Sequence, residues 1–401
     1  MHVSVFMGPA ALTSAQDGPL ISQCLRLSEQ AAQAGFAMVT FGEQHFNNYE
    51  PYSNPFLMAA RLAPVLGDCW FGTTIVPLPF QHVLRLAEES SIVDVLTGGR
   101  LLMGMSAGRV GIGSDWVNFN ADETRRQEAF DSKLDLLLKA YRQKAGDPPL
   151  VFDNDFDRGR LTGRMMPAPY RDGGPQLAIG TNTDATIDDV AARGLALFLG
   201  PCPLPDALAK FARHRAALVA AGFSAAHVDD ATAKSLVTRY VIVGPTEDEA
   251  WQAAERMAGR SPLIDRSKDP RSLRELSQVP LDEVARDLFP RNVLHVRGWM
   301  TVGTPDSVTT QLRAYVEQGV RHLNTRFTVG TYNPDLVQRS FDLFVDEVLP
   351  ALEPELFRGP SLQQIAPEHR PDADVMAVPA QPRADLPRPT FVAGSPVPAN
   401  S

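Results

Sequence analysis

The stretch of residues 70–108, WFGTTIVPLPFQHVLRLAEESSIVDVLTGGRLLMGMSAG, holds two short apolar runs with an amphipathic segment between them. Residues 70–76 are apolar and partly β-branched, which predicts a buried strand. Residues 82–96 have helical spacing, and Gly98 and Gly99 end that helix. Residues 101–105 form the second apolar run. Together they predict a unit of two parallel strands joined by a crossover helix.

The same alternation continues on both sides of this unit. Eight strand-then-helix units in series predict a (β/α)8 barrel, or TIM barrel, of the α/β class. A doubly wound sheet is the rival interpretation, but Gly8-Pro9-Ala10-Ala11 after the first strand is not its glycine fingerprint. The six further strands are predicted at residues 3–7, 38–41, 177–179, 195–199, 237–243 and 322–327.

Two insertions and a tail depart from the repeating unit. Residues 145–175, before the fifth strand, contain strand-like pieces around Gly159 and Gly163. Residues 259–303, before the eighth strand, are charged and long for a barrel loop. Residues 358–401 contain nine prolines, which predicts a disordered or extended tail after a barrel domain of residues 1–357.

The second insertion has two interpretations. Its residues 262–295 would close over the barrel mouth as a lid, or they would pack as a solvated insertion on the side of the barrel. A short helix with one apolar face is predicted on Leu281, Val284, Leu288 and Phe289.

The most regular helix is predicted around residues 130–141. Phe130, Leu134, Leu137 and Tyr141 share one face of it, so they are expected to pack on the barrel. The charged residues between them, Lys133 included, are expected to face water.

Composition and charge exclude several classes of protein. The 38 lysines and arginines against 47 aspartates and glutamates give a net charge of −9, which argues against nucleic acid as the main partner. No apolar run is long enough for a membrane span, and no signal-peptide pattern is present. The three cysteines are widely spaced, which excludes a disulfide scaffold or a CxxC metal site and favours a cytoplasmic location. No histidine spacing predicts a metal site.

In a (β/α)8 barrel the working residues lie at the carboxyl ends of the strands. Glu43, Gln44 and His45 follow the second strand, where Glu43 and His45 are either an acid–base pair or a packed histidine with its carboxylate. The other strand ends carry small, polar and aromatic residues that suit a ligand with a flat ring and an anionic tail. These are Phe6, Met7, Thr73, Thr74, Ile75, Gly104 to Gly108, Gly180, Thr181, Asn182, Gly200, Pro201, Tyr240 and Arg326.

Residues 104–108, GMSAG, match the G-x-S-x-G nucleophile elbow of serine hydrolases, with Ser106 as the nucleophile. The elbow needs a helix directly after the serine, and helical character returns only near Glu123. The hydrolase interpretation is therefore the weaker one. In a barrel, small residues at a strand end also let a loop approach a ligand.

The turn Gly180-Thr181-Asn182-Thr183 leads from the fifth strand into a helix. Helix amino termini bind anions through free N–H groups and the helix dipole. An ordinary helix N-cap would have the same residues, so this turn alone does not decide between an anion-binding site and a cap.

Together these segments resemble the bacterial luciferase-like flavin monooxygenases. The matching stretches are residues 34–36, 41–46 (FGEQHF), 54–55, 72–79 (GTTIVPLP), 82–88, 94–100, 104–108 and 344–350 (FVDEVLP). The resemblance covers about residues 1–353, and the motifs occur in the family's order.

The resemblance implies a barrel that binds reduced FMN at its mouth. Thr74-Ile75, after Thr73, matches the family's non-prolyl cis peptide beneath the flavin ring. Ser106, followed by Ala107, matches the position beside the reactive carbon of the flavin. Arg125 matches the arginine that holds the FMN phosphate, and Gly180, Thr181, Asn182 and Thr183 match the phosphate-binding turn.

Two positions depart from the family's pattern. The family often has two histidines after the glutamate, and the first is Gln44 here, so an acid or base role moves to His45 or elsewhere. Light emission is thereby put in doubt. The arginine expected after Ser106 is Ala107, with Arg109 two positions later.

The implied function is a two-component monooxygenase, in which reduced FMN and O2 form a C4a-hydroperoxyflavin that oxygenates a small organic substrate. A separate flavin reductase, a homodimer and a role in natural-product biosynthesis belong to the same expectation. An F420-dependent oxidoreductase of the same fold is the alternative. A non-catalytic flavin-binding protein, or the hydrolase with Ser106, would be a different class.

Overall fold

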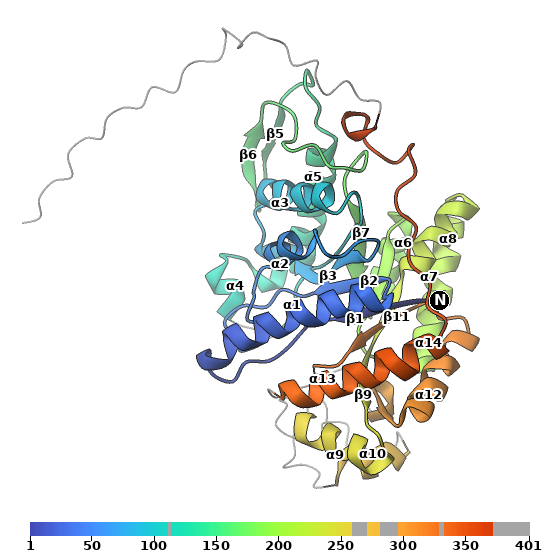
Figure 1. The fold of residues 1–401 in the computed structure, drawn as a ribbon. Coiled ribbons are helices and arrows are strands. Elements are labelled where there is room, and N and C mark those ends of the chain that lie inside the picture. The colour runs from blue at the N-terminus through green and yellow to red at the C-terminus, as the bar shows by residue number, and fades with distance from the viewer. Residues whose placement is uncertain (111–113, 259–270, 281–295, 329–332, 372–401) are drawn as a thin grey trace, which may run out of the picture.

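The computed structural model describes residues 1–110, 114–258, 271–280, 296–328 and 333–371 (Figure 1). Eight parallel strands form a closed barrel, because β11 pairs with β1 and β8 pairs with β9. The predicted barrel is confirmed. Its strands are β1 (His2–Phe6), β2 (Met38–Phe41), β3 (Trp70–Pro77), β4 (Leu101–Ser106), β7 (Gln176–Gly180), β8 (Ala196–Leu199), β9 (Leu236–Val243) and β11 (His322–Arg326).

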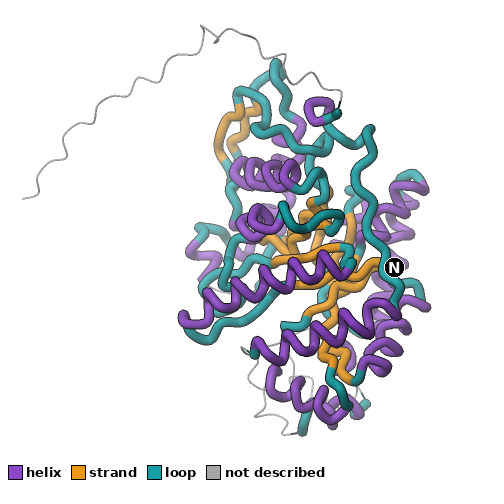
Figure 2. Tube along the Cα trace, in the orientation of Figure 1, coloured by secondary structure: helices purple, strands orange, loops and turns teal. Residues whose placement is uncertain are grey.

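Helices cover the outside of the barrel (Figure 2). Local sequence sets the bounds of the first two helices. Gly35, with φ 91°, ends α1. The Asn54 side chain caps the start of α2, which begins at Pro55. The longer helices are α1 (Asp17–Ala34), α2 (Pro55–Leu62), α3 (Val83–Leu96), α5 (Arg126–Arg142), α6 (Asp184–Ala192), α7 (Leu204–Ala220), α8 (Ala225–Lys234), α9 (Glu247–Ala258), α12 (Pro305–Glu317) and α13 (Pro334–Leu343). The short ones are α4 (Ser114–Asn118), α10 (Leu273–Gln278), α11 (Val296–Trp299) and α14 (Leu349–Ala351).

The core has two main parts. The larger part lies between the strands and the surrounding helices. The smaller part includes Met38, Trp70 and Leu102 from neighbouring strands, with Phe357 packed against them. Phe357 comes from the segment after α14, and its ring lies 4.1 Å from that of His2. The segment directly after the last barrel helix therefore takes part in the core.

The first insertion forms an antiparallel hairpin of β5 (Leu150–Asp153) and β6 (Arg158–Leu161). The prediction that Lys133 faces water is wrong, because this residue is buried under the hairpin. Lys133 is only 5% exposed. Its ammonium group lies 3.0 Å from both carboxylate oxygens of Asp157 on the hairpin and donates to the Gln81 carbonyl at 2.9 Å. The hairpin covers a face of α5 that helical periodicity alone assigns to water.

The second insertion is described only in part, as α10, α11 and β10 (Met300–Gly303), which pairs with the carboxyl half of β9. The helix predicted on Leu281, Val284, Leu288 and Phe289 lies outside the described residues, as does most of the segment proposed as a lid. The start of the tail, residues 358–371, lies on the barrel surface and forms a bridge between Ile365 and Arg171. Within the described residues, none of the helices is long and apolar enough to cross a membrane.

Candidate active site at the barrel mouth

The carboxyl ends of the strands surround a cavity of about 290 Å³. It brings together several of the predicted residues from distant parts of the chain. Thr74 and Ile75 come from β3, and Gly180, Thr181 and Asn182 from the end of β7. Phe6, Phe198, Leu199, Gly200, Pro201, Leu236, Thr238, Tyr240 and Arg326 line the rest.

The peptide bond between Thr74 and Ile75 is cis, as the resemblance to the flavin monooxygenases implies. The pairing of β3 with β4 shifts register between Thr73 and Val76, at the same place. Thr73 itself is buried, and its hydroxyl donates to the Gly104 carbonyl at 2.8 Å. Thr73 thus fixes the neighbouring strand, while Thr74 and Ile75 reach the cavity.

Two buried oxygens at this cavity, Thr74 Oγ1 and Asn182 Oδ1, have no hydrogen-bond partner among the described residues. A buried polar atom without a partner costs about 1–3 kcal/mol, so a bound polar ligand would satisfy both. A Cβ on Gly180 would lie 3.1 Å from the Ile75 side chain, and one on Gly200 3.2 Å from Asn182 Nδ2. Glycine at both positions keeps the cavity open. These features fit a flat ligand with polar edges.

Arg326 is the charged side chain among the described residues that line the cavity. It donates to the hydroxyl of Tyr240 at 3.1 Å, to the carbonyl of Thr328 at 3.0 Å and to the carbonyl of Gly8. Its guanidinium lies over the rings of Phe6, at 4.6 Å, and Tyr240, at 5.0 Å. The arginine is therefore held rigidly, with its charge at the cavity wall.

Glu43 and His45, which follow β2, form a pair at the same barrel mouth, and neither is among the residues that line the cavity. His45 Nε2 donates to Glu43 Oε1 at 3.0 Å, and the Gln81 amide donates to the same oxygen at 2.5 Å. Burial raises the pKa of the Glu43 carboxyl, against the opposing effect of these hydrogen bonds. The side chain of Gln44 turns away and accepts from Asn47 at 2.7 Å. Of the three predicted residues, the structure brings two together.

Glu50, which sequence analysis did not identify, lies under the same loop. It is 4% exposed, its backbone has φ 53°, and its Oε2 has no hydrogen-bond partner among the described residues. A Cβ on Gly42 would overlap the Glu50 carboxyl. Burial raises the pKa of Glu50 to about 7, with Glu43 adding to the shift and Arg326 opposing it.

Glu50→Gln is expected to change how stability depends on pH. The folded-state pKa of about 7 lies above the ordinary value of 4.5, so the stability that the neutral carboxyl preserves is lost as pH rises through this window. The full shift corresponds to about 3 kcal/mol. Denaturant unfolding at about pH 5 and about pH 8 measures the free energy of unfolding of both proteins. The variant should gain stability relative to wild type at the higher pH. Parallel pH profiles would contradict the assignment.

Ser106 is 8% exposed, and its hydroxyl accepts from the Gly108 N–H at 3.2 Å. None of the described histidines hydrogen-bonds to it, so the arrangement that activates a serine nucleophile is missing from the described structure. Ala107 is half-buried and Arg109 exposed. The glycine-rich turn holds the loop close to the barrel mouth.

Arg125 is not among the residues that line the cavity. Its guanidinium pairs with Glu128 and with Asp155 of the hairpin loop, at 2.8 Å each, and lies 4.8 Å from the ring centre of Phe156. Thr183 is exposed, and its N–H donates to Thr181 Oγ1 at 3.0 Å. The structure thus joins the 180–182 turn to the cavity and leaves Arg125 with two carboxylates.

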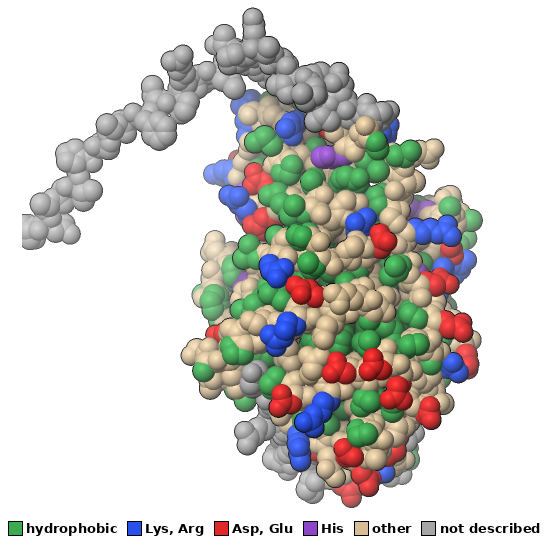
Figure 3. All heavy atoms as spheres, viewed as in Figure 1, with side chains coloured by type: hydrophobic (Ala, Val, Ile, Leu, Met, Phe, Trp, Pro, Cys, Tyr) green, Lys and Arg blue, Asp and Glu red, His purple; other side chains and the backbone are tan. Residues whose placement is uncertain are grey.

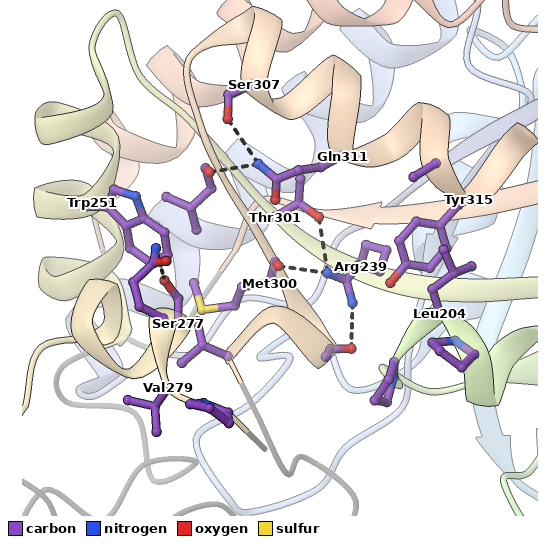
Figure 4. Close-up of a pocket in the computed structure, with 18 of the residues that line it drawn as sticks. Leu204, Arg239, Trp251, Ser277, Val279, Met300, Thr301, Ser307, Gln311 and Tyr315 are labelled. Carbon is purple, nitrogen blue, oxygen red and sulfur yellow. Dashed lines mark hydrogen bonds between the residues drawn. The ribbon is translucent and has the colours of Figure 1, made fainter. Parts of the chain in front are cut away.

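A larger cavity, of about 970 Å³, lies outside the barrel between α7, α9, α10, β10 and α12 (Figure 4). Arg239 reaches it from β9 and donates to the carbonyls of Gly298 and Met300. Pro280 and Val296 line it and flank residues 281–295, which lie outside the described chain.

A closed parallel barrel with buried polar atoms at the carboxyl ends of its strands is the arrangement of a (β/α)8 enzyme. The chain belongs to the luciferase-like monooxygenase family, whose model matches residues 1–322.

Two relatives illustrate the similarity in sequence. The chain is 28% identical over 174 residues to 4-hydroxyprotoasukamycin monooxygenase of Streptomyces nodosus subsp. asukaensis, covering 43% of this chain and 45% of that protein. It is 31% identical over 109 residues to the oxygenase component of the flavin-dependent trigonelline monooxygenase of Acinetobacter baylyi, covering 27% of this chain and 30% of that protein. The chain thus matches less than half the length of each relative.

Solved structures share the fold over nearly their whole length. Monooxygenase RslO1 from Streptomyces bottropensis superposes with a TM-score of 0.70 at 21% identity, covering 88% of this chain and 100% of that one. The oxygenating constituent of 3,6-diketocamphane monooxygenase from Pseudomonas putida, solved in complex with FMN, superposes with a TM-score of 0.68 at 16% identity. The match covers 89% of this chain and 99% of that one.

Proposed function

We propose that this protein is the oxygenase component of a two-component monooxygenase that uses reduced FMN and O2 to oxygenate a small organic substrate. The observation that carries the proposal is the cavity at the mouth of a luciferase-like barrel, where the buried oxygens Thr74 Oγ1 and Asn182 Oδ1 have no hydrogen-bond partner among the described residues. The FMN complex of a protein with the same fold supports the choice of cofactor.

Thr74 and Ile75 line the cavity and would lie against the flavin ring. Thr73, Ser106 and Ala107 are not among the lining residues, and their proposed place around the ring rests on the resemblance to the family. The turn of Gly180, Thr181, Asn182 and Thr183 would bind the phosphate through backbone N–H groups and hydroxyls. When bound, reduced flavin supplies the electrons that activate O2. The protein's own task is to orient the reactants and exclude water.

The Glu43–His45 pair would carry out proton transfer. Glu43 holds the His45 ring through Nε2, which leaves Nδ1 to accept or return a proton. Gln44 cannot exchange a proton near neutral pH, and its hydrogen bond to Asn47 supports a role in shaping the loop.

A separate flavin reductase would supply reduced FMN, because the Acinetobacter baylyi relative is the oxygenase component of its monooxygenase. We also propose a cytoplasmic location, since Cys24, Cys69 and Cys202 are buried free thiols. We propose a role in natural-product biosynthesis from the similarity to 4-hydroxyprotoasukamycin monooxygenase.

A homodimer through α2 and α3 is proposed from their exposed apolar side chains. Leu57 is 68%, Ile92 44% and Leu96 51% exposed. Hydrophobic side chains lie between scattered charges on the face that contains these helices (Figure 3). Exposed apolar patches of this kind mark association surfaces.

Leu57→Glu with Ile92→Glu is expected to convert the dimer to a monomer, because it places like charges in an apolar interface. Light scattering after size-exclusion chromatography measures the mass. Val219→Glu on α7, where the wild-type side chain is 59% exposed, is the matched control and should leave the dimer intact. Equal masses for all the proteins would refute this interface.

Arg125→Ala is expected to weaken binding of reduced FMN by roughly 10- to 150-fold, the value of a charge-assisted contact to phosphate. To make that contact, the Arg125 side chain would leave its ion pair with Glu128 or Asp155 and pair with the phosphate instead. Anaerobic titration measures the Kd. An unchanged Kd would leave phosphate binding to the 180–183 turn alone.

The proposed function is tested by titrating the purified protein with reduced FMN without oxygen and then adding O2, with reduced F420 in a parallel series. Binding of reduced FMN with protein-dependent O2 uptake supports the proposal. Preference for F420 would favour the oxidoreductase alternative. Tight binding of oxidised FMN without O2 uptake would indicate a flavin-binding protein that does not turn over.

A further inference from the structure

Five aromatic rings form a continuous cluster at the barrel mouth, which we call the aromatic wall: His45, Phe46, Phe80, Trp116 and Phe119. Phe119 is its centre, stacked on Phe80 with ring centres 5.3 Å apart and on Phe46 at 6.4 Å. The His45 ring lies 4.5 Å from Phe119, and Trp116 meets Phe80 edge-on at 4.7 Å.

The wall stands across the mouth from most of the cavity. Its rings come from the segments after β2, β3 and β4, whereas the cavity is formed mainly by the ends of β1, β7, β8, β9 and β11. Trp116 and Phe80 are buried, at 3% and 8% exposure, and Phe46 at the other end is 78% exposed. Gly108 fits under the Trp116 ring, where a Cβ would come within 2.9 Å. The wall therefore runs from the Ser106 loop out to solvent.

Phe46 is unusual in both its exposure and its backbone. Its φ is 55°, in the left-handed region that disfavours bulky side chains. Four of the six described non-glycine residues with positive φ lie in residues 46–53. Such conformations cost about 1–3 kcal/mol each and cluster at functional sites. Because its ring is mostly exposed, Phe46 recovers little of this cost by burial, and stability does not explain its placement.

The wall also carries the acid–base pair. His45 Nε2 donates to Glu43, and no described residue hydrogen-bonds to Nδ1. In that tautomer Nδ1 is an acceptor, at the side of a flat aromatic surface. A ligand that stacks on the wall and carries a hydroxyl group would satisfy both features.

We propose that the substrate is a planar aromatic compound with an acidic hydroxyl, which stacks on Phe46 and Phe119 and donates that hydroxyl to His45 Nδ1. This inference rests on the proposed function for its reaction but concerns only the substrate class. A flat ring matches the faces of Phe46 and Phe119, whose planes lie 23° apart, and its hydroxyl proton passes to a nitrogen that Glu43 holds in place.

Calorimetric binding to the full chain, with and without FMN, tests the class with three probes. They are 2-naphthol, 2-methoxynaphthalene, which lacks the donor, and 1-decanol, which has the same number of carbons and a hydroxyl but no ring. We expect 2-naphthol to bind more tightly than 1-decanol. It should also bind about 2- to 13-fold more tightly than 2-methoxynaphthalene, the value of one net hydrogen bond.

Three variants separate stacking from hydrogen bonding. Phe46→Ala should weaken the binding of both naphthalene probes about 2- to 13-fold and leave the binding of 1-decanol unchanged. His45→Phe keeps a ring but removes the acceptor, so it should abolish the preference for 2-naphthol over 2-methoxynaphthalene. Val219→Ala, at a distant exposed position, should change nothing. Because Phe46 is mostly exposed, its replacement leaves the core intact.

Tighter binding of 1-decanol than of 2-naphthol would overturn the inference, and so would unchanged binding of both naphthalene probes by Phe46→Ala. A preference for the hydroxyl that persists in His45→Phe would overturn the role of Nδ1. The outcomes are distinct from failure of the proposed function, which would appear as absent binding of reduced FMN in the same protein.

Discussion

His45→Ala is expected to lower the rate of substrate oxygenation on the order of 100- to 10,000-fold, the range of a lost general acid or base. His45 is the ring that Glu43 holds at 3.0 Å, and its side chain is 15% exposed. Binding of reduced FMN should be unchanged, because the residue acts on the reacting groups rather than on the cofactor. Single-turnover kinetics, with the FMN Kd measured separately, makes the comparison.

Gln44→Ala is the neighbouring control. Its side chain bonds Asn47 and not Glu43, so a small effect is expected. Full turnover in His45→Ala would make the histidine a packing residue. A loss in Gln44→Ala as large as that in His45→Ala would mean that the loop conformation, and not the imidazole, is required.

Lys133→Ala is expected to lower the free energy of unfolding by about 3–5 kcal/mol, because it leaves the Asp157 carboxylate buried without its partner. The two side chains are 6% and 5% exposed. The same ammonium group holds the Gln81 carbonyl, and the Gln81 amide in turn bonds Glu43. Denaturant unfolding measures the stability, with exposed Lys139→Ala as the control.

The turnover rate of the Lys133→Ala variant tests whether Lys133 also positions Gln81. If Lys133 positions Gln81, kcat should fall at temperatures where the variant is folded, and Lys133→Arg should restore part of it. A stability equal to that of the Lys139 control would show that the buried pair contributes nothing.

The barrel could be predicted from the sequence because each unit is a local pattern. A buried strand reads as a short apolar run and its helix as a 3.6-residue period, so residues 70–108 already contain the repeating element. The carboxyl ends of such strands meet at one rim, so the sequence also predicts that Glu43, His45, Thr74, Ile75 and the 180–182 turn lie at the barrel mouth.

The contacts that complete the site join residues far apart in the chain, and periodicity carries no information about them. Gln81 reaches Glu43 across 38 residues, and Arg326 reaches Gly8 across 318. The burial of Lys133 depended on a hairpin whose docking no helical pattern encodes. Glu50 gave no signal either, because its positive φ and missing hydrogen-bond partner exist only in the folded loop. The sequence by itself determined the barrel and which segments reach its mouth. Tertiary packing alone decided which side chains meet there, because those pairs are made by non-local contacts.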